Sequence, residues 1–233
     1  MSDDQSKSDK FIRKVRSFVR REGRFTTAQK SALERLMPTW GLYLEKGLYD
    51  WDKVFERNAK VVFEIGFGNG DALLQCAQRE PETNFIGDEV HRPGVGRLLH
   101  NAEEAGLTNL RVFTDDAVEV LKSCVTDQSL DEVRIYFPDP WHKKKHNKRR
   151  IIQPEFISLL CKKLKPSGRI HLATDWEHYS EQMMEVLSAE PLLSNIAGAN
   201  AFHPRPESRP QTHFETRGQK LGHGVWDLIF ELK

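Results

Sequence analysis

The chain is poor in the residues and runs that mark specialised protein classes. It contains three cysteines, Cys76, Cys124 and Cys161, with no CxxC pair and no Cys/His cluster, which argues against a disulfide scaffold and a zinc site. We expect small buried side chains at these positions and no bound metal. No run approaches the roughly 18 apolar residues of a membrane span, and the acidic, polar N-terminus is unlike an export signal. We therefore expect a cytoplasmic protein that does not bind a membrane.

The net charge of +1 hides a marked segregation of charge along the chain. Residues 1–30 hold nine Lys/Arg against four Asp/Glu, and residues 142–150 add six positive charges. Such basic segments on an otherwise acidic chain favour a polyanionic partner, because phosphate contacts supply much of the affinity for nucleic acids. A solubilising tail and a solvated loop are the alternative interpretation. We expect residues 1–50 to form a basic, partly disordered extension ahead of one domain over residues 51–233.

From residue 60 onward, short apolar segments alternate with amphipathic stretches of about ten residues. Strands are predicted at 61–65, 84–90, 110–114, 133–137, 169–174 and 225–230. Helices are predicted at 71–79, 94–105, 117–123, 154–164 and 177–187, with an earlier one at 27–37 that Pro38 closes. This alternation is typical of βαβ units, and the last strand has no helix after it. We expect a doubly wound α/β sheet, mostly parallel, with helices on both faces and an antiparallel C-terminal edge.

The first predicted strand ends in an acidic residue followed by glycines. Gly66, Gly68 and Gly70 come directly after Glu64, and glycine permits a tight turn and a close approach of ligand to backbone. The third glycine comes one residue too early for the GxGxxG dinucleotide fingerprint, and Asp71 stands where that glycine belongs. Two carboxylates would repel a pyrophosphate. The pattern favours a ligand with a cationic amine or sulfonium, such as S-adenosylmethionine.

Two further strand ends carry acidic residues. Glu89 follows Glu64 by 25 residues, where such sheets hold a carboxylate that accepts both hydroxyls of a ribose. Asp88 precedes it, but consecutive strand residues point to opposite faces, so we assign the ribose contact to Glu89. Asp116 is the candidate acceptor for an adenine amino group. A solvated strand end for Glu89 and helix capping alone for Asp116 are the alternatives.

The fourth predicted strand runs into a turn that carries an acid and an aromatic residue. Pro138 and Pro140 fix the backbone on either side of Asp139. A carboxylate at this place can accept from two N–H groups on one edge of a nucleobase. Trp141 can stack on a base or pack under the loop. Because the basic run follows at once, phosphates would be drawn to the same place.

Methyl transfer from a sulfonium is an in-line displacement, so the protein must chiefly align the donor carbon with a lone pair. An amine or hydroxyl acceptor requires a base, whereas guanine N7 offers a lone pair with no proton to lose. No Lys/His/Asp relay is visible in the sequence. This favours Asp139 as a residue that orients the base over one that acts as a strong general base.

Six segments together closely resemble the bacterial tRNA (guanine-N7)-methyltransferase family. They are Phe63-Glu64-Ile65-Gly66-Phe67-Gly68, Glu89-Val90-His91, Phe137-Pro138-Asp139-Pro140-Trp141-His142-Lys143, His146-Asn147-Lys148-Arg149-Arg150, Ala173-Thr174-Asp175-Trp176 and Gly222-His223-Gly224-Val225-Trp226-Asp227. The third and fourth of these are highly specific. The resemblance covers nearly the whole chain, including the Arg-Arg-Glu-Gly-Arg stretch at residues 20–24.

The resemblance implies a class I S-adenosylmethionine-dependent fold with a seven-stranded sheet. It implies methylation of N7 of a guanine, conventionally at position 46, in the variable loop of tRNA. The donor-binding residues that it implies are Glu64, Gly66, Gly68, Glu89, Asp116 and Asp139, with Asp139 also as the catalytic residue. The substrate-binding residues that it implies are Lys143, Asp175, Thr212, His213, Phe214 and Glu215. Asp88 departs from the apolar residue expected before the ribose acid.

Three other functions compete with this interpretation. An adenine amino-group methyltransferase acting on DNA or RNA has a similar acid and aromatic residue after its fourth strand. A tRNA-binding module without catalysis would keep the basic run and lose donor turnover. A nicotinamide dehydrogenase is disfavoured by the glycine spacing. We expect tRNA as the partner, no obligatory protein partner, and a monomer or homodimer.

Overall fold

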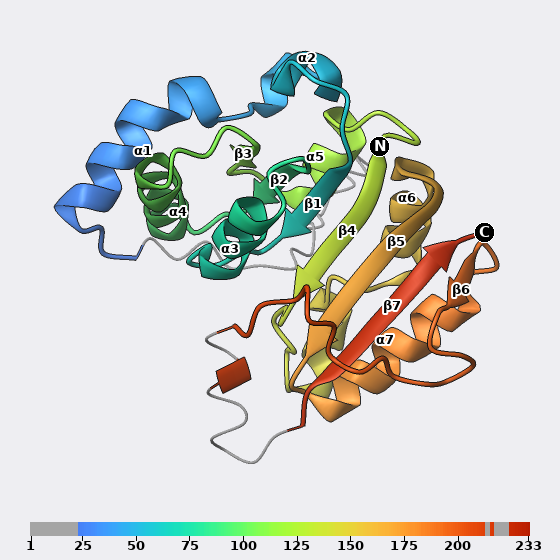
Figure 1. Cartoon of the computed structure of the whole chain (residues 1–233). Coiled ribbons are helices and arrows are strands. Elements are labelled where there is room, and N and C mark those ends of the chain that lie inside the picture. Colours follow the sequence, from blue (N-terminus) through green and yellow to red (C-terminus); the bar gives the residue numbers. More distant parts are fainter. Residues whose placement is uncertain (1–22, 213–214, 217–223) are drawn as a thin grey trace, which may run out of the picture.

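The protein folds around one seven-stranded sheet, as seen in a computed structural model that describes residues 23–212, 215–216 and 224–233 (Figure 1). The strands lie in the order β3-β2-β1-β4-β5-β7-β6. They are β1 (Val61–Ile65), β2 (Asn84–Asp88), β3 (Leu110–Phe113), β4 (Leu130–Tyr136), β5 (Leu164–Thr174), β6 (Leu193–Asn195) and β7 (Trp226–Leu232). The first five pair in parallel, and β7 is antiparallel to β5 and β6. The predicted α/β architecture with an antiparallel edge is confirmed.

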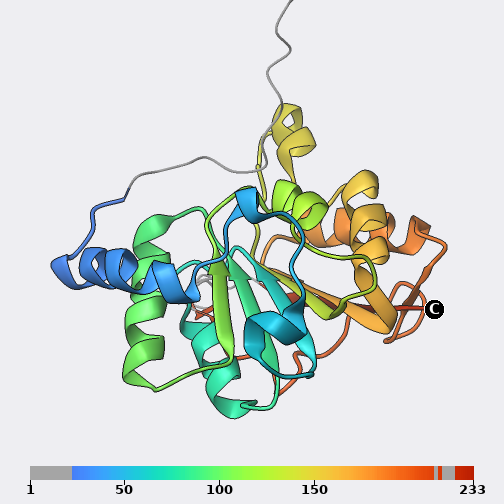
Figure 2. The same cartoon turned by 90° about the horizontal axis from the view of Figure 1, so that it is seen from above.

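Helices cover both faces of the sheet (Figures 1 and 2). They are α1 (Thr27–Trp40), α2 (Trp51–Phe55), α3 (Asp71–Arg79), α4 (Arg92–Glu104), α5 (Ala117–Ser123), α6 (Pro154–Lys163) and α7 (Glu177–Ala189), with 3-10 helices η1 (Leu44–Lys46) and η2 (Lys144–Arg149). Strand residues alternate between faces, so Phe63 packs with α2, α5, α6 and α7 while Val62 packs with α1, α3 and α4. All three cysteines are buried in these two cores, as expected.

The chain ahead of the first strand packs onto this body. α1 lies beside α4 (Figures 1 and 2), and Leu33 and Leu36 are buried in the core that the two helices share. The Arg35 guanidinium pairs with the Glu103 carboxylate of α4 on the outer surface. The backbone N–H of Leu42 donates to the carbonyl of Val112 on β3 at 2.7 Å. The predicted domain boundary at residue 51 stays a prediction, and residues 1–22 of the basic extension lie outside the described residues.

Several element boundaries differ from those predicted. α1 continues through Pro38 to Trp40, because packing on α4 outweighs the helix-breaking effect of a single proline. β5 begins at Leu164 rather than residue 169, and β2 ends at Asp88 rather than residue 90. β6 was not predicted, since a three-residue strand has too few positions to display a period. Among the residues that the structure describes, none of the helices is both long and apolar enough to cross a membrane.

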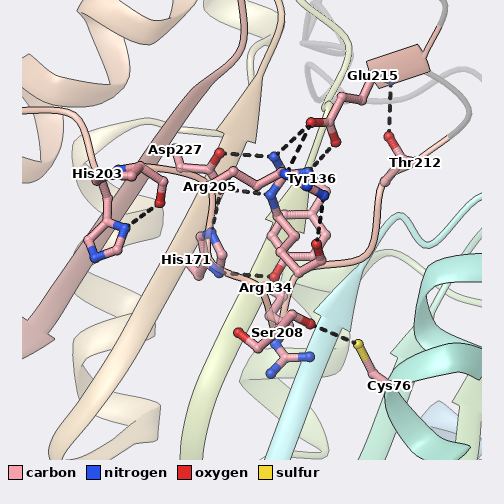
Figure 3. A network of polar contacts seen from close by, with 12 residues as sticks. Cys76, Arg134, Tyr136, His171, His203, Arg205, Ser208, Thr212, Glu215 and Asp227 are labelled. Carbon is pink, nitrogen blue, oxygen red and sulfur yellow. Dashed lines mark hydrogen bonds and ion pairs between the residues drawn. The ribbon is translucent and has the colours of Figure 1, made fainter. Parts of the chain in front are cut away.

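On the face of the sheet where α3 and α4 pack, strands β4, β5 and β7 are covered by the segment between β6 and β7 rather than by a helix. There β4, β5 and β7 present a row of buried polar residues that includes Arg134, His171 and Asp227. The segment between β6 and β7 crosses this row (Figure 3), and its His203 backbone N–H donates to the Asp227 carbonyl at 2.8 Å. The carbonyl of Ser208 in the same segment accepts from Arg79 of α3 at 2.9 Å. The segment therefore connects β7 to α3 across this face of the sheet.

Candidate active site

A cavity of about 830 Å³ lies at the carboxyl ends of the parallel strands, the edge at which doubly wound sheets bind ligands. Its lining includes most of the residues singled out in the sequence. These are Glu64, Gly66, Gly68, Glu89, Asp139, Lys143 and Thr212. Of the described candidates, Asp116, Asp175 and Glu215 are not part of the lining. His213 and Phe214 lie outside the described residues.

The glycine turn after β1 presents bare backbone to the cavity. Gly66 and Gly68 have φ angles of +75° and +60°, a left-handed region that other residues rarely adopt. A Cβ added to either would meet no described atom within 4 Å, so the space beside both is open. On its other side the turn is tightly packed, because a Cβ on Gly94 of α4 would lie 2.0 Å from the Gly68 carbonyl oxygen. The turn can accommodate a ligand on one side only.

Glu64 brings a buried carboxyl group to the wall of the cavity. Its residue is 3% exposed, and its Oε2 has no hydrogen-bond partner among the described residues. Burial raises the pKa of Glu64 to about 7, although Arg134 opposes the rise. A buried acceptor without a partner is costly, and a ligand ammonium or sulfonium would remove that cost. The side chain and the open glycine turn therefore fit the cationic amino acid portion of S-adenosylmethionine.

Glu89 ties the end of β2 to the glycine turn. Its Oε2 accepts from the Gly68 backbone N–H and its Oε1 from the His91 backbone N–H, both at 2.8 Å. Each carboxylate oxygen retains further acceptor capacity, so Glu89 can hold the turn and still receive hydroxyl donors. The ribose contact stays a prediction.

Asp88 is the last residue of β2 and also lines the cavity. It is 2% exposed, and its Oδ1 has no hydrogen-bond partner among the described residues. Burial raises the pKa of Asp88 well above the ordinary value, and neighbouring Glu89 and Asp115 add to the rise. Asp88 and Asp115 line the cavity, whereas the sequence reasoning chose Glu89 and Asp116 from the same two pairs, because adjacent acids do not reveal which side chain faces the cavity.

Asp116 caps α5, which is expected of this residue whether or not it also contacts a ligand. Its Oδ1 accepts from the Val118 backbone N–H at 3.0 Å. Its neighbours Asp115 and Ala117 line the cavity, so Asp116 lies next to the position predicted for adenine. A contact between Asp116 and the adenine amino group stays a prediction.

The turn after β4 carries Asp139 to the lining of the cavity. Phe137 and Trp141, on either side of the Pro-Asp-Pro segment, have φ angles of +51° and +46°. Such values cost energy in residues with side chains and persist where surrounding contacts enforce them. The Phe137 backbone N–H donates to the Ala173 carbonyl at 2.8 Å, which fixes one side of the turn. The exposed Asp139 carboxylate is thus held on a rigid support beside the open volume.

The basic run begins at the edge of the cavity, and its cations have different roles. Lys143 lines the cavity, and with Lys144, Lys145 and Lys148 it is exposed. The short helix η2, yellow in Figure 2, projects from the body and carries most of this charge. Arg149 lies over the Trp141 ring, 3.9 Å from its centroid. Arg150 is the exception, because it is buried. The expectation that all six basic residues face a polyanionic partner is therefore wrong for this residue.

Arg150 is 2% exposed and acts within the protein. It donates from Nε to the Pro140 carbonyl at 2.8 Å and from Nη1 to Gln182 of α7. Its guanidinium also lies over the Tyr179 ring, 4.6 Å from the centroid. The residue therefore braces the turn that carries Asp139. A run of basic letters gives no signal of this, because the direction of a side chain depends on what packs beside it.

The segment between β6 and β7 reaches the cavity through Thr212. Glu215 lies behind it, buried in an ion pair with Arg209, and Asp175 is half-buried after β5. Trp176, next to Asp175, packs edge-on against His142 with ring centroids 4.3 Å apart. The substrate contacts assigned to Lys143, Asp175, Thr212 and Glu215 stay predictions.

A chain of side-chain contacts leads from Tyr136 in the cavity lining to His171 and Asp227. No sign of it is visible in the sequence. The Tyr136 hydroxyl is 3.0 Å from His171 Nδ1, and His171 Nε2 is 2.8 Å from Asp227 Oδ1. The three residues come from neighbouring strands β4, β5 and β7 and share one face of the sheet. Since they are far apart in the chain, only strand pairing brings them together.

The chain is similar to known proteins over almost its whole length. Residues 58–228 match a family model described as a putative methyltransferase. A protein of Idiomarina loihiensis named tRNA (guanine-N(7)-)-methyltransferase is 57% identical over 99% of this chain and 94% of its own. Proteins of the same name from Alcanivorax borkumensis and Xanthomonas oryzae are 56% and 58% identical, over 98% and 94% of this chain and 96% and 87% of their own.

Solved structures with low sequence identity share the fold. The 16S rRNA methyltransferase KamB superposes with a TM-score of 0.59 at 14% identity, over 78% of this chain and 92% of its own. The aminoglycoside resistance methyltransferase NpmB1 gives 0.55 at 15% identity, over 83% and 95%. The family match and the relatives of more than 50% identity show that the chain belongs to the tRNA (guanine-N7)-methyltransferase family.

Proposed function

We propose that the protein transfers a methyl group from S-adenosylmethionine to N7 of a guanine in the variable loop of tRNA, at position 46. One observation carries this proposal. A single cavity holds the acid-and-glycine turn of β1 on one wall and the rigid turn with Asp139 on another, with the exposed basic run at its edge. Donor, base and phosphate backbone would meet there.

The donor end of the cavity is formed by the residues that follow β1 and β2. Glu64 would hold the cationic amino acid portion, and the exposed backbone at Gly66 and Gly68 would lie along it. Glu89 would accept the ribose hydroxyls while it keeps the glycine turn in place. Bound S-adenosylmethionine supplies an electrophilic methyl group on a sulfonium.

The acceptor end requires orientation more than proton transfer. Guanine N7 has no proton to lose, so the protein must hold the base with its lone pair in line with the methyl carbon. Asp139 is suited to this, because an exposed carboxylate on a rigid turn can accept from two N–H groups of one base edge. Tyr136 lines the cavity, but its hydroxyl is already hydrogen-bonded to His171, which in turn contacts Asp227. Asp139 therefore serves as the orienting residue.

The test is transfer of labelled methyl groups from S-adenosylmethionine to unmodified tRNA, followed by nucleoside analysis. Wild-type protein is expected to place the label in 7-methylguanosine, and Asp139→Ala to lose it. Glu82→Ala, which removes an exposed acid just ahead of β2, is the matched control and should retain activity. Label in N6-methyladenosine would replace the proposal with adenine methylation. RNA binding without any methyl transfer would indicate a binding module.

A further inference from the structure

Arg209 is the most completely buried cation of the segment that leads to Thr212. Its side chain is 0% exposed and touches two carboxylates at once. Nη1 and Nη2 donate to Glu215 at 2.7 and 3.3 Å, while Nε and Nη2 donate to Asp227 at 2.7 and 2.9 Å. The guanidinium also lies 5.8 Å from the Tyr136 and Phe137 ring centroids. A planar fork of this kind fixes direction as well as charge.

The two carboxylates belong to different parts of the molecule (Figure 3). Asp227 is on β7 and is anchored to the sheet through His171, which in turn contacts Tyr136 on the cavity wall. Burial lowers the pKa of His171. A neutral ring, which this shift favours, would donate from Nε2 to Asp227 and accept from the Tyr136 hydroxyl at Nδ1. Arg209 is thereby connected to the floor of the site by side chains with defined directions.

Glu215 belongs to the segment that reaches the cavity. Arg209 and Glu215 stand three residues before and three residues after Thr212, which lines the cavity. The Thr212 Oγ1 accepts from the Glu215 backbone N–H at 3.1 Å, and its carbonyl accepts from the Thr216 N–H at 3.0 Å. The ion pair joins Arg209 to Glu215, and Glu215 in turn donates to Thr212, so the position of Thr212 depends on both residues.

We infer that Arg209 is a positioning residue for the methyl acceptor: by clamping Glu215 to Asp227, it holds Thr212 in the lining of the cavity. This inference rests on the proposed function and adds a residue to its acceptor side. Glu215 then anchors the segment to Arg209. Its residue is 1% exposed, and both of its carboxylate oxygens accept from the Arg209 guanidinium. Buried ion pairs contribute little net stability but can specify one geometry.

The molecule supplies a buried cation for comparison. Lys163 at the end of α6 is 6% exposed, and its Nζ donates to the Val125 carbonyl at 2.8 Å and to Asp127 at 2.6 Å. It lies at the start of β5, whereas the cavity opens at the carboxyl ends of the strands. Lys163→Met removes a buried charge without touching the acceptor segment. A loss of kcat/KM in Arg209→Met that exceeds the loss in Lys163→Met is therefore due to the position of Arg209 beside the segment that leads to Thr212.

The experiment compares wild type, Arg209→Met, Arg209→Lys, Glu215→Gln and Lys163→Met. Steady-state methylation of tRNA and calorimetric binding of S-adenosylmethionine are measured for each. For Arg209→Met we expect kcat/KM for tRNA to fall on the order of 100-fold, as for a misplacement of about 1 Å, with donor Kd within about three-fold of wild type. Arg209→Lys should recover only part of the loss. The lysine keeps the positive charge, but one ammonium group cannot hold two carboxylates in the fixed geometry of a guanidinium. Lys163→Met should keep the wild-type kcat/KM.

Hydrogen exchange of the Glu215 and Thr216 amides gives a readout that does not depend on catalysis. These amides donate to Thr212, so exchange should accelerate in both Arg209 variants and in Glu215→Gln but not in Lys163→Met. Donor affinity lost in parallel with activity, or amide protection unchanged in Arg209→Lys and Glu215→Gln, would overturn the inference. If wild type makes no 7-methylguanosine, the proposed function fails while the exchange comparison still decides whether Arg209 orders this segment.

Discussion

The Arg150 guanidinium donates a hydrogen bond to the Pro140 carbonyl at 2.8 Å, and so the last cation of the basic run supports the turn that carries Asp139. The same side chain reaches Gln182 and the Tyr179 ring on α7. The turn is thereby joined to a helix on the face opposite α3 and α4. Adjoining basic residues thus differ in environment: Arg150 is buried and supports the turn, whereas Lys148 is exposed.

Arg150→Met should destabilise the protein by about 2 kcal/mol, because the Pro140 carbonyl and Gln182 lose their buried donor. Lys148→Met, two residues earlier and exposed, should change the unfolding free energy by less than about 0.5 kcal/mol. Chemical denaturation of both variants measures the difference. Equal effects of the two substitutions would contradict the structural role of Arg150.

Lys143→Ala should weaken tRNA binding while donor affinity stays close to wild type. Lys143 is exposed at the edge of the cavity and can neutralise a phosphate. Loss of one phosphate contact should reduce the slope of log K against log salt by about 1. Binding titrations at several salt concentrations measure this, with exposed Lys122→Ala as the control. A parallel loss of donor affinity would show that Lys143 belongs to the donor end instead.

Donor affinity should fall as pH decreases through about 7, because the pKa of Glu64 is raised to about 7 by burial. Below this value the carboxyl group is neutral in the free protein, and charging it on binding costs roughly ten-fold in affinity per pH unit. Calorimetric titration with S-adenosylmethionine between about pH 5.5 and 8.5 measures the profile. Glu64→Gln should bind weakly with no such step, and any pH dependence that it retains comes from the donor itself.

Asp88→Asn should stabilise the protein at neutral pH but not at acidic pH. Burial raises the pKa of Asp88 well above its ordinary value, so the native state binds the proton more tightly than the unfolded chain. The wild type therefore loses stability as pH rises from the unfolded pKa of about 3.9 through the raised value. Unfolding free energies of both proteins across this range should converge at low pH. Glu82→Gln, at an exposed carboxyl, should leave the pH profile as it is in wild type.

Gly94→Ala should reduce donor affinity more than Gly96→Ala does. A methyl group on Gly94 would lie 2.0 Å from the Gly68 carbonyl and displace the glycine turn. A methyl group on Gly96 would lie 2.3 Å from the Gln29 carbonyl of α1 and disturb helix packing away from the cavity. Donor titration and thermal unfolding of both variants separate the two effects. Similar donor affinities would show that the turn tolerates displacement.

Local sequence patterns predicted the elements that build the donor side of the site. β1, α3 and α5 lie at the predicted residues, because apolar periodicity, glycines and an acidic cap are all readable within a few positions. Glu64, Gly66 and Gly68 reach the cavity for the same reason, since a parallel sheet brings the carboxyl ends of its strands to one edge. Six short segments, of which the run around Asp139 is among the most specific, together indicated the family, and the relatives confirm it.

Only the tertiary structure decided the roles that depend on direction and burial. Arg150 turned inward while Lys148 stayed outside, and Asp116 caps a helix while Asp115 lines the cavity. The network from Tyr136 to Arg209 arises because β7 pairs antiparallel with β5 and the segment before it crosses the sheet. Contacts between residues this far apart in the chain follow from strand order and packing, which leave no local period in the sequence. The sequence alone therefore determined the fold class and the family, and the folded chain determined which side chains line the cavity and which hold the site in place.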